Sequence, residues 1–404
     1  MPKAQDGFHL IPVLLLILVI SIVGYAGYRV IEKATSSDSS TSSNIPDPRD
    51  QGPNYKALPK CGDGPVLTKS PIDLSVLDTI SPLGSINPPE HTIPTDHMYF
   101  MYRYERDQNE RYDIVAPADA VVTSFGFSGE VDNGQTKNAD YSITLSPCRG
   151  LSFRFSHVNS LEGKLKGEIG PKGENANCHT DKPTTARAIM TCGKTADIPI
   201  SVGDVMGQVG ANYVAAWDFW AHKEGYKNPG ITTPAYRYDT DAVCGLDYFV
   251  DDIKTQMYAL VKRVGEPKCG EIGQDKKDTL QGSWFAHKDP EKARTDWNSH
   301  LTLGHDSGDA NFGILAVAGK IADPFTYRFS PTHTGGTNRE PGETTIGTLY
   351  CYQHDGNRRF DNGTFAGEGK VLLKLTDNKT MQAEHKNGSC SVNESFSNPT
   401  TYYR

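Results

Sequence analysis

The chain has 404 residues, 37% of them hydrophobic and 22% charged, with a formal net charge of −8 at pH 7. The acidic balance and the lack of a basic stripe argue against nucleic acid as a partner, because phosphate backbones are bound by clustered lysines and arginines. A chain of this length exceeds what one hydrophobic core usually holds, so we expect two domains.

The N-terminus predicts a membrane anchor. A short leader, residues 1–7, precedes a run from Gly7 to Tyr28 that contains no Asp, Glu, Lys or Arg. At about 1.5 Å per residue, a helix of this run is long enough to cross a hydrocarbon core of about 30 Å. We therefore predict a transmembrane helix over residues 8–30. Because almost nothing precedes it, the bulk of the chain is expected on the extracytoplasmic side of the membrane.

The same segment, KAQDGFHLIPVLLLILVI, resembles a type IV prepilin leader, in which a basic segment and a Gly-Phe junction precede an apolar helix. The junction corresponds to Gly7 and Phe8. Pilins carry a glutamate at the fifth mature position, where this chain has Pro12. The resemblance therefore implies an anchor, and a pilin-like surface structural subunit remains an alternative function.

Residues 34–60 are predicted to form a disordered linker. Ser, Asp and Pro dominate the segment, and no apolar periodicity is present. Such a segment buries too little apolar surface to offset the entropy of ordering it.

Eight cysteines follow the first 60 residues, and none forms a Cys-x-x-Cys motif, which argues against a structural zinc finger. An even number outside the membrane predicts disulfide bonds. Proximity within a domain favours the pairs Cys178–Cys192 and Cys351–Cys390.

The rest of the chain predicts a mainly β fold. Residues 61–245 contain short alternating runs such as DYSITLSP and LSFRFSHV, which are typical of strands. Residues 246–265 change to a three- and four-residue period and predict a connecting amphipathic helix. Residues 266–404 again predict β-strands, with many turns between them, and therefore an antiparallel sandwich or barrel. In this last part, matches to the N-glycosylation pattern, which also arises often by chance, occur at Asn362, Asn378, Asn387 and Asn393.

Four segments of the first β domain occur in a characteristic order. PPEHTIPTDHMYF comes first, VAPADAVVTSF follows, FRFSHVNSL is third, and VGDVMGQVGANYVAAWDFWAHKEG is last. In this order they resemble the lysostaphin-type zinc endopeptidases, the group with the duplicated hybrid motif, over roughly residues 85–225. That family has a His and an Asp four residues apart, an APADG-V strand, a strand ending Tyr-x-His-Leu, a glycine-rich turn and a His-x-His strand. The resemblance implies a lysostaphin-like β domain.

The resemblance also implies candidate zinc ligands. His91 matches the first ligand, but Asp96 follows at five residues instead of four, and residues five apart on a strand face opposite sides. His97 would share the face of His91, so His91 with His97 is an alternative pair. Asp218-Phe219-Trp220 occupies the His-x-His position, where Trp220 cannot bind zinc. Asp218 and His222 are the remaining candidate ligands on this strand.

His157 matches the family histidine that activates the zinc-bound water or stabilises the oxyanion. Without a metal, it is equally a hydrogen-bonded histidine at the end of a strand. Because the ligand positions depart from the family pattern, no cofactor is expected. Zinc is the expected cofactor only if the peptidase is active.

The strand WDFWAH carries a second signal. Aromatic rings beside carboxylates are typical of sugar-binding clefts, which predicts ligand contacts from Trp217, Trp220 and Asp218. Trp217 and Phe219 share one face of the strand, and Asp218 and Trp220 share the other, so one set should face outward or toward a cleft. Core filling is the alternative role for the inward set.

These observations predict a membrane-anchored envelope protein with a degenerate, non-catalytic lysostaphin-like module. Its expected partner is a cell-envelope glycan or peptide, with the membrane bound through the N-terminal helix. The alternatives are an active zinc endopeptidase acting on peptidoglycan and the pilin-like structural subunit.

Overall fold

The computed structural model describes residues 52–404 except 90, 104–108, 133–134, 171–176, 182–187, 211–214, 237, 239 and 357–368. The predicted leader, the transmembrane helix over residues 8–30 and residues 34–51 of the linker lie outside the described residues. Within the described part of the chain, no helix is both long enough and apolar enough to span a membrane.

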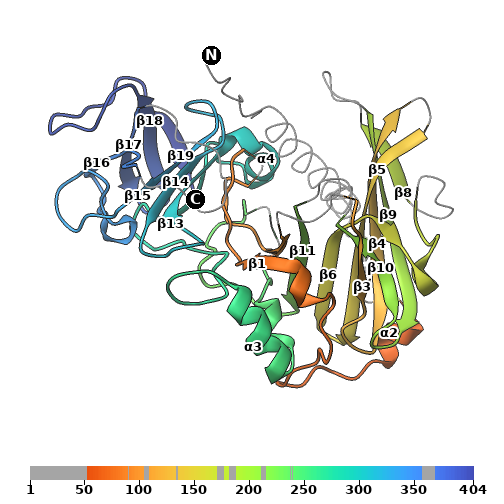
Figure 1. The fold of residues 1–404 in the computed structure, drawn as a ribbon. Helices are drawn as coiled ribbons and strands as arrows, with labels where there is room; N and C mark the ends of the chain where they lie inside the picture. The colour runs from red at the N-terminus through yellow and green to blue at the C-terminus, as the bar shows by residue number, and fades with distance from the viewer. Residues whose placement is uncertain are drawn as a thin grey trace, which may run out of the picture. The chain divides into compact units, whose positions relative to one another are not determined.

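The described chain is mainly β, as predicted, and its contacts divide it into two units (Figure 1). Unit 1 comprises residues 52–76 and 102–217, and unit 2 comprises residues 77–101 and 218–404. The sequence predicted a boundary between two domains at the helix of residues 246–265. The contacts of the folded chain instead divide it after residues 76, 101 and 217. The reason is the packing of residues 77–101, in which Ile86 contacts Ile314 and Ala316 of the C-terminal sheet.

Unit 1 is built on antiparallel strands in the order β6-β5-β4-β9-β8, with a smaller sheet ordered β3-β10-β7. The elements are α2 (Pro53–Ala57), η2 (Leu74–Val76), β3 (Tyr112–Val115), β4 (Ala120–Asp132), β5 (Gln135–Cys148), β6 (Leu151–Val158), β7 (Ser160–Leu161), η3 (Gly163–Leu165), β8 (Asn177–Asp181), β9 (Ala188–Ile200) and β10 (Val205–Val209). One face of the larger sheet is apolar and buried: Phe125, Phe127, Ile143, Leu145, Phe153 and Phe155.

Helix α2 corrects the predicted linker. The Asp197 carboxylate accepts hydrogen bonds from the backbone N–H groups of Asn54 and Tyr55, at 3.0 and 2.9 Å. These are orphan donors in the first turn of the helix, so the contact both caps the helix and fastens it to β9. The prediction of disorder to residue 60 is therefore wrong from residue 52 onward.

Three further strands are ordered β1-β2-β11: β1 (Leu77–Ser81), β2 (Met98–Tyr102) and β11 (Ala216–Lys223). They belong to unit 2 except for Tyr102, Ala216 and Trp217, which belong to unit 1. The predicted helix over residues 246–265 is shorter, because it divides into η4 (Gly245–Tyr248) and α3 (Asp251–Leu260). Phe249 and Val250 between them have non-helical backbone, with ψ of 150° and 151°. Val261 ends α3 because it is extended and pairs with Ile80.

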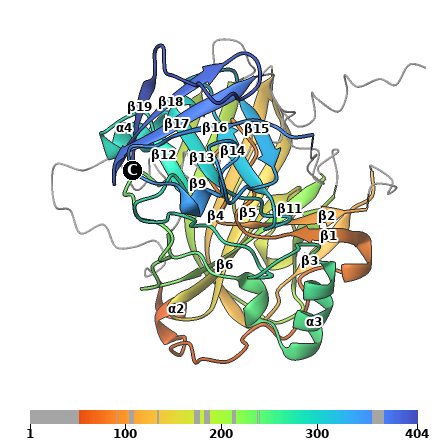
Figure 2. The same ribbon diagram turned by 90° about the vertical axis from the view of Figure 1, so that its left-hand side faces the viewer.

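The C-terminal part of unit 2 is an antiparallel, nearly closed and barrel-like sheet of eight strands (Figure 2). The order is β15-β14-β13-β12-β19-β18-β17-β16. The elements are β12 (Gly282–Phe285), α4 (Pro290–Thr295), η5 (Trp297–Ser299), β13 (His300–His305), β14 (Gly313–Val317), β15 (Phe325–Phe329), η6 (Pro341–Glu343), β16 (Leu349–Tyr352), β17 (Lys370–Asp377), β18 (Thr380–Lys386) and β19 (Thr400–Tyr403).

Side chains join the two edge strands of this sheet. The rings of Phe329 and Tyr352 lie 5.3 Å apart, and His354 Nδ1 lies 2.9 Å from the Arg328 carbonyl oxygen. The interior is filled by buried apolar and aromatic side chains that include Trp284 and Tyr402. The coarse prediction of an antiparallel C-terminal β domain is confirmed.

All eight cysteines are paired. The predicted pairs Cys178–Cys192 and Cys351–Cys390 are confirmed. The other two pairs are Cys61–Cys148 and Cys244–Cys269, and each disulfide lies within one unit.

We expect each disulfide to stabilise the fold by an amount that increases with the logarithm of the number of residues in the loop that it closes. In the chain-entropy model, the 14-residue separation of Cys178–Cys192 contributes about 3 kcal/mol and the 87-residue separation of Cys61–Cys148 about 4.6 kcal/mol. Paired Cys→Ser variants should therefore show the larger fall in guanidinium unfolding midpoint for Cys61–Cys148. Equal midpoints for the two double variants would contradict the entropic account.

Candidate functional site

The loop before β2 folds back on itself and brings His91 near the start of the strand. Asn87 and His91 exchange backbone hydrogen bonds of 2.6 and 3.0 Å, and Thr95 N–H donates to the Ser85 carbonyl at 3.1 Å. These pairings place the proline-rich segment in a hairpin-like loop. His91, Asp96 and His97 therefore share one region of unit 2 with the β11 residues Asp218 and Trp220.

A single carboxylate oxygen organises this region. Asp96 Oδ1 lies 2.9 Å from His97 Nδ1 and accepts a 2.9 Å hydrogen bond from the indole N–H of Trp220. The rings of His97 and Trp220 are 4.3 Å apart, while Asp96 and His97 are both buried. Asp96 thus holds a histidine and a tryptophan together, and we call these three residues with Tyr99 the Asp96 network.

The tautomer of His97 follows from its partners. His97 Nε2 lies 3.0 Å from the Tyr99 hydroxyl. Burial, and then the nearby Asp218 carboxylate, raise the pKa of Tyr99 well above its usual value, so its hydroxyl stays protonated. Since the Asp96 carboxylate can only accept, the Nδ1–H of His97 donates to it.

His91 and Asp218 border the network. His91 Nδ1 lies 2.6 Å from the Tyr238 hydroxyl, and its ring is 5.7 Å from that of His97. Asp218 Oδ2 is 3.9 Å from His97 Nε2. His222 is directed elsewhere, since its Nδ1 lies 3.1 Å from Asp241 Oδ1.

This arrangement does not fit a catalytic zinc ion. Zinc needs three protein donors that converge on one point at about 2 Å. Here Asp96 binds an indole N–H, and both ring nitrogens of His97 have hydrogen-bond partners. Among the residues that the structure describes, no group of three or more His, Cys, Asp or Glu is arranged to hold a metal.

Trp217 does not contact solvent. Its ring is fully buried and stacks on Phe155 at 5.6 Å, and Phe219 on the same face of β11 is also buried. The prediction that Trp217 binds a ligand is therefore wrong, because this face of the strand fills the core. Asp218 and Trp220 lie on the opposite face, and Trp220 is half-buried.

His157 belongs to unit 1 and is paired with a carboxylate. Asp140 accepts from the backbone N–H of His157 at 3.1 Å, and its Oδ2 lies 2.6 Å from His157 Nδ1. The backbone of His157 has φ of +62°, a strained conformation for a residue with a Cβ. Asp140 therefore holds both the backbone and the ring of His157.

Asp140 is part of a polar sheet face that the sequence interpretation missed. In the cross-strand register, Ser128 is opposite both Asp140 and Thr191, Gly126 is opposite Ser142, and Thr144 is opposite Arg154. Small polar residues and glycines thus occupy every second position of four neighbouring strands. The face comprises Ser124, Gly126, Ser128, Asp140, Ser142, Thr144, Ser152, Arg154, Ser156, Thr191, Gly193 and Thr195, and we call it the hydroxyl face.

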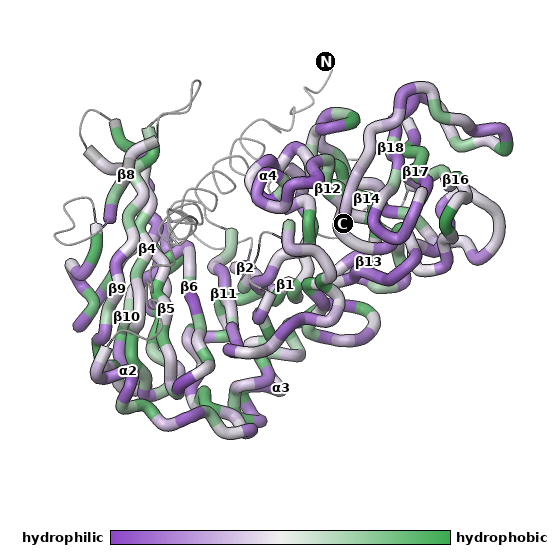
Figure 3. The backbone as a smooth tube through the Cα atoms, turned by 180° about the vertical axis from the view of Figure 1, so that it is seen from behind, coloured by the Kyte–Doolittle hydropathy of each residue, from purple (hydrophilic) through white to green (hydrophobic). Residues whose placement is uncertain are grey.

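The sequence carried a signal for this face. In SFGFS and in DYSIT, small or polar residues alternate with apolar or aromatic ones (Figure 3). Three of its hydroxyl groups, on Ser128, Ser156 and Thr191, are buried and have no hydrogen-bond partner in the described part of the chain. Buried hydroxyls are nearly always hydrogen-bonded in native proteins. These three hydroxyls can therefore still accept or donate hydrogen bonds.

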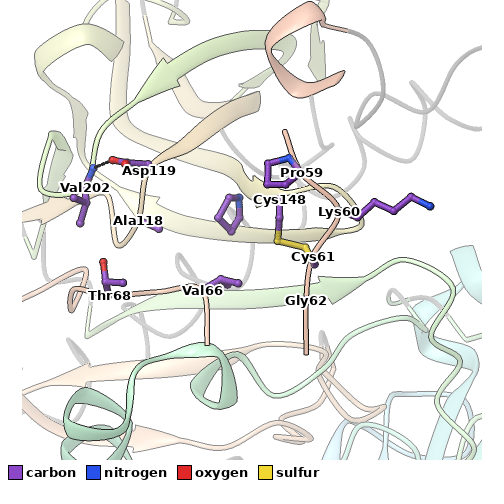
Figure 4. Close-up of a pocket in the computed structure, with 11 residues that line it drawn as sticks. Pro59, Lys60, Cys61, Gly62, Val66, Thr68, Ala118, Asp119, Cys148 and Val202 are labelled. Carbon is purple, nitrogen blue, oxygen red and sulfur yellow. Dashed lines mark hydrogen bonds between the residues drawn. A yellow bond between two sulfur atoms is a disulfide. The ribbon is translucent and has the colours of Figure 1, made fainter. Parts of the chain in front are cut away.

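A surface pocket lies elsewhere in unit 1, around the Cys61–Cys148 disulfide (Figure 4). Its volume is about 360 Å³, and Asp119 at its edge accepts a 2.8 Å hydrogen bond from the Val202 N–H. Its lining is Pro59, Lys60, Cys61, Gly62, Val66, Thr68, Ala118, Asp119, Pro147, Cys148 and Val202. This mostly apolar lining does not include any residue of the Asp96 network or the hydroxyl face.

The C-terminal sheet carries a separate charged histidine. His305 Nδ1 lies 3.0 Å from the Ala310 carbonyl oxygen and Nε2 lies 3.0 Å from Glu340 Oε1. Neither partner can donate while Glu340 is ionised, so both nitrogens of His305 carry protons. The Glu340 hydrogen bond raises the pKa of His305 despite burial. Although burial raises the pKa of Glu340, the His305 hydrogen bond leaves it below its usual value.

Comparisons with known proteins give no relative. No protein-family model, no curated protein and no solved structure matches the chain. The function is therefore inferred from the geometry of the two units.

We expect the full chain, purified without chelator, to contain no stoichiometric zinc, because the donors of the Asp96 network are bonded to one another. Trp220→His replaces the indole with an imidazole beside Asp96 and His97, and should increase zinc affinity at least tenfold over the natural chain. Trp297→His is the control, since Trp297 is also half-buried but lies outside the network. One zinc per natural chain, lost in His91→Ala, would reverse this interpretation.

We expect the His305–Glu340 pair to make stability pH-dependent. Because folding raises the pKa of His305 above 6.5, its contribution to the free energy of unfolding is complete below about pH 6.5 and is lost as pH rises through the raised pKa. Unfolding midpoints measured from pH 5 to 9 should therefore fall less steeply for His305→Gln than for the natural chain. His333→Gln, at a histidine whose side chain is 71% exposed, should leave the slope unchanged, and identical slopes for all three chains would refute the assignment.

Proposed function

We propose that the chain is a membrane-anchored, extracytoplasmic protein that binds a glycan or peptide of the cell envelope without hydrolysing it. In this proposal the lysostaphin-like module is degenerate: its sheet is retained for binding, and its metal site is replaced by hydrogen bonds between side chains. The observation that carries the proposal is the hydroxyl face of unit 1.

The hydroxyl face has the chemistry of a surface for a polar polymer. Each serine or threonine hydroxyl both donates and accepts, which matches sugar hydroxyls and backbone amides equally. Most of these side chains are small, and the register places hydroxyl groups of several neighbouring strands on one face of the sheet. Four strands about 4.8 Å apart span roughly 14 Å, the length of about four residues of extended peptide.

The unpartnered hydroxyls of this face are one reason to propose a ligand. A buried hydroxyl without a hydrogen bond costs about 1–3 kcal/mol, and three such groups lie on this face at Ser128, Ser156 and Thr191. A valine or alanine at these positions would avoid that cost. Ligand atoms that bond these groups would recover it, which gives the residues a reason to be polar.

The same face offers charged groups at one side. Arg154 donates to the Ser142 hydroxyl at 3.4 Å, and Asp140 holds His157. A guanidinium and a carboxylate on adjacent strands can orient a polymer that carries both amide and carboxyl groups. This combination suits the peptide or amino-sugar components of an envelope.

The Asp96 network supports binding without hydrolysis. In the sequence, Trp220 occupies the position of the family's last zinc-binding histidine, and Asp96 lies near the position of its aspartate ligand. The indole N–H of Trp220 donates a hydrogen bond to Asp96. An active endopeptidase would have to break this hydrogen bond and the His97–Asp96 contact to form a metal site. The pilin-like alternative depends on residues 1–30, which lie outside the described residues.

The test separates ligand binding from stability. Ser128→Ala and Thr191→Val remove unpartnered hydroxyls, so the free energy of unfolding should stay the same or rise. If a ligand bonds these groups, each variant should weaken retention of the full chain on insoluble cell-envelope polymer about two- to tenfold. Depletion assays with purified polymer and detergent-solubilised protein measure this change.

Thr326→Val is the matched control, because Thr326 in unit 2 is also buried and has an unpartnered hydroxyl. It should leave retention unchanged. Unaltered retention in Ser128→Ala and Thr191→Val, or no retention of the natural chain, would reject the hydroxyl face as the binding surface.

A further inference from the structure

Asparagines followed two positions later by Ser or Thr occur in one part of the chain only. None of the 15 asparagines before Asn362 has Ser or Thr two positions later. Asn362, Asn378, Asn387 and Asn393 then all have it, and the last asparagine, Asn398, is followed by Pro399. Asn-x-Ser/Thr with x other than Pro is the acceptor pattern for N-linked glycans. Every match therefore falls within the final 43 residues.

The structure gives the three described matches a common environment. Asn378, Asn387 and Asn393 are all exposed, and each lies in a turn or bend outside the strands. Their side-chain amides make no hydrogen bond within the described chain. Other asparagines are used for structure: Asn54 donates to Asp197, and Asn338 accepts from the Gln353 N–H. The three are thus free of the packing and bonding that occupy amides elsewhere.

The two turns that carry these residues are well fixed. Asn378 lies in the tight turn between β17 and β18, where the Lys379 N–H donates to Asp377 at 2.8 Å. The loop after β18 is held by the Cys351–Cys390 disulfide and by the Lys370–Glu394 ion pair at 2.6 Å. The acceptor amides are therefore displayed by ordered backbone.

The tip of the second loop projects fully into solvent. Val392, next to Asn393, is 98% exposed. Glu384 fixes the far side of the loop by accepting from the Ser397 and Asn398 N–H groups at 2.7 and 3.1 Å. A large substituent on Asn393 would extend from this tip without displacing any buried side chain.

We propose that Asn378, Asn387 and Asn393 carry N-linked glycans. The donor is an oligosaccharide joined to a lipid through a pyrophosphate, used by a transferase outside the cytoplasm. The asparagine Nδ2 forms a bond to the anomeric carbon and loses one proton to a transferase base. The bond from that carbon to the pyrophosphate oxygen breaks, and the lipid pyrophosphate leaves with the electron pair. No oxidant or reductant is needed.

The four disulfides support the compartment that this step requires. Disulfides persist in oxidising environments outside the cytoplasm, which is where glycans are attached to exposed loops. The inference is independent of the binding proposal, since the hydroxyl face lies in unit 1 and the acceptor asparagines lie in unit 2. Glycans here would cover the two ends of the β17–β18 hairpin.

The experiment is mass spectrometry of the full chain isolated from the membranes of the cells that encode it. Trypsin releases Asn378 on the short peptide LTDNK, while Asn387, Asn393 and Asn398 share the peptide that follows Lys386. Electron-transfer fragmentation should locate hexose- or amino-sugar-containing masses on Asn378, Asn387 and Asn393. Asn398 is exposed in the same loop but precedes proline, so it should be unmodified and serves as the internal control.

Two substitutions separate enzymatic transfer from chemical change. Ser395→Ala should reduce occupancy at Asn393 to background and leave Asn378 and Asn387 unchanged, whereas Ser395→Thr should retain it. Unmodified peptides at all three positions would overturn the proposal. So would a modification of Asn393 that persists in Ser395→Ala.

Discussion

The chemistry of the predicted site depends on one buried carboxylate. Asp96 is only 3% exposed, and a charge so far from water must be hydrogen-bonded to be tolerated. Two N–H groups, from His97 and Trp220, supply those bonds. They fix the position of a loop before β2 against β11, and they set the tautomer of His97. Because the carboxylate is occupied in this way, the residues around it form a hydrogen-bond network.

The larger sheet of unit 1 has one apolar face and one face of mostly small polar side chains. Its apolar face buries large rings such as Phe127 and Phe155, each of which stabilises the fold by about 1.5–3 kcal/mol. Its hydroxyl face contributes little hydrophobic energy and leaves Ser128 and Thr191 without partners.

The C-terminal sheet differs from the larger sheet of unit 1 because it closes around an apolar interior. Aromatic side chains such as Trp284 and Tyr402 fill its interior. Arg328 and Asp306 form a buried 2.9 Å ion pair beside the protonated His305, and both carry structural hydrogen bonds. The accessible chemistry of this part of the chain is therefore in its turns, where exposed asparagines repeat.

The sequence alone determined the features that depend on neighbouring residues. Alternating runs predicted the strands, and short separations predicted Cys178–Cys192 and Cys351–Cys390. The opposed faces of WDFWAH also follow from the two-residue period of a strand, although which face is inward does not. Local geometry fixes the strands and their faces because the period of a strand is two residues, whereas the two cysteine pairs, 14 and 39 residues apart, were predicted from proximity within a domain.

Only the tertiary structure decided the features that join distant segments. Trp220 and Asp96 are 124 residues apart, and no local pattern states that an indole will bind that carboxylate. The Cys61–Cys148 pair, the burial of Trp217 and the placement of residues 77–101 in unit 2 are of the same kind. In each case the outcome depends on which surfaces the folded chain brings together, and that is set by the packing of whole sheets.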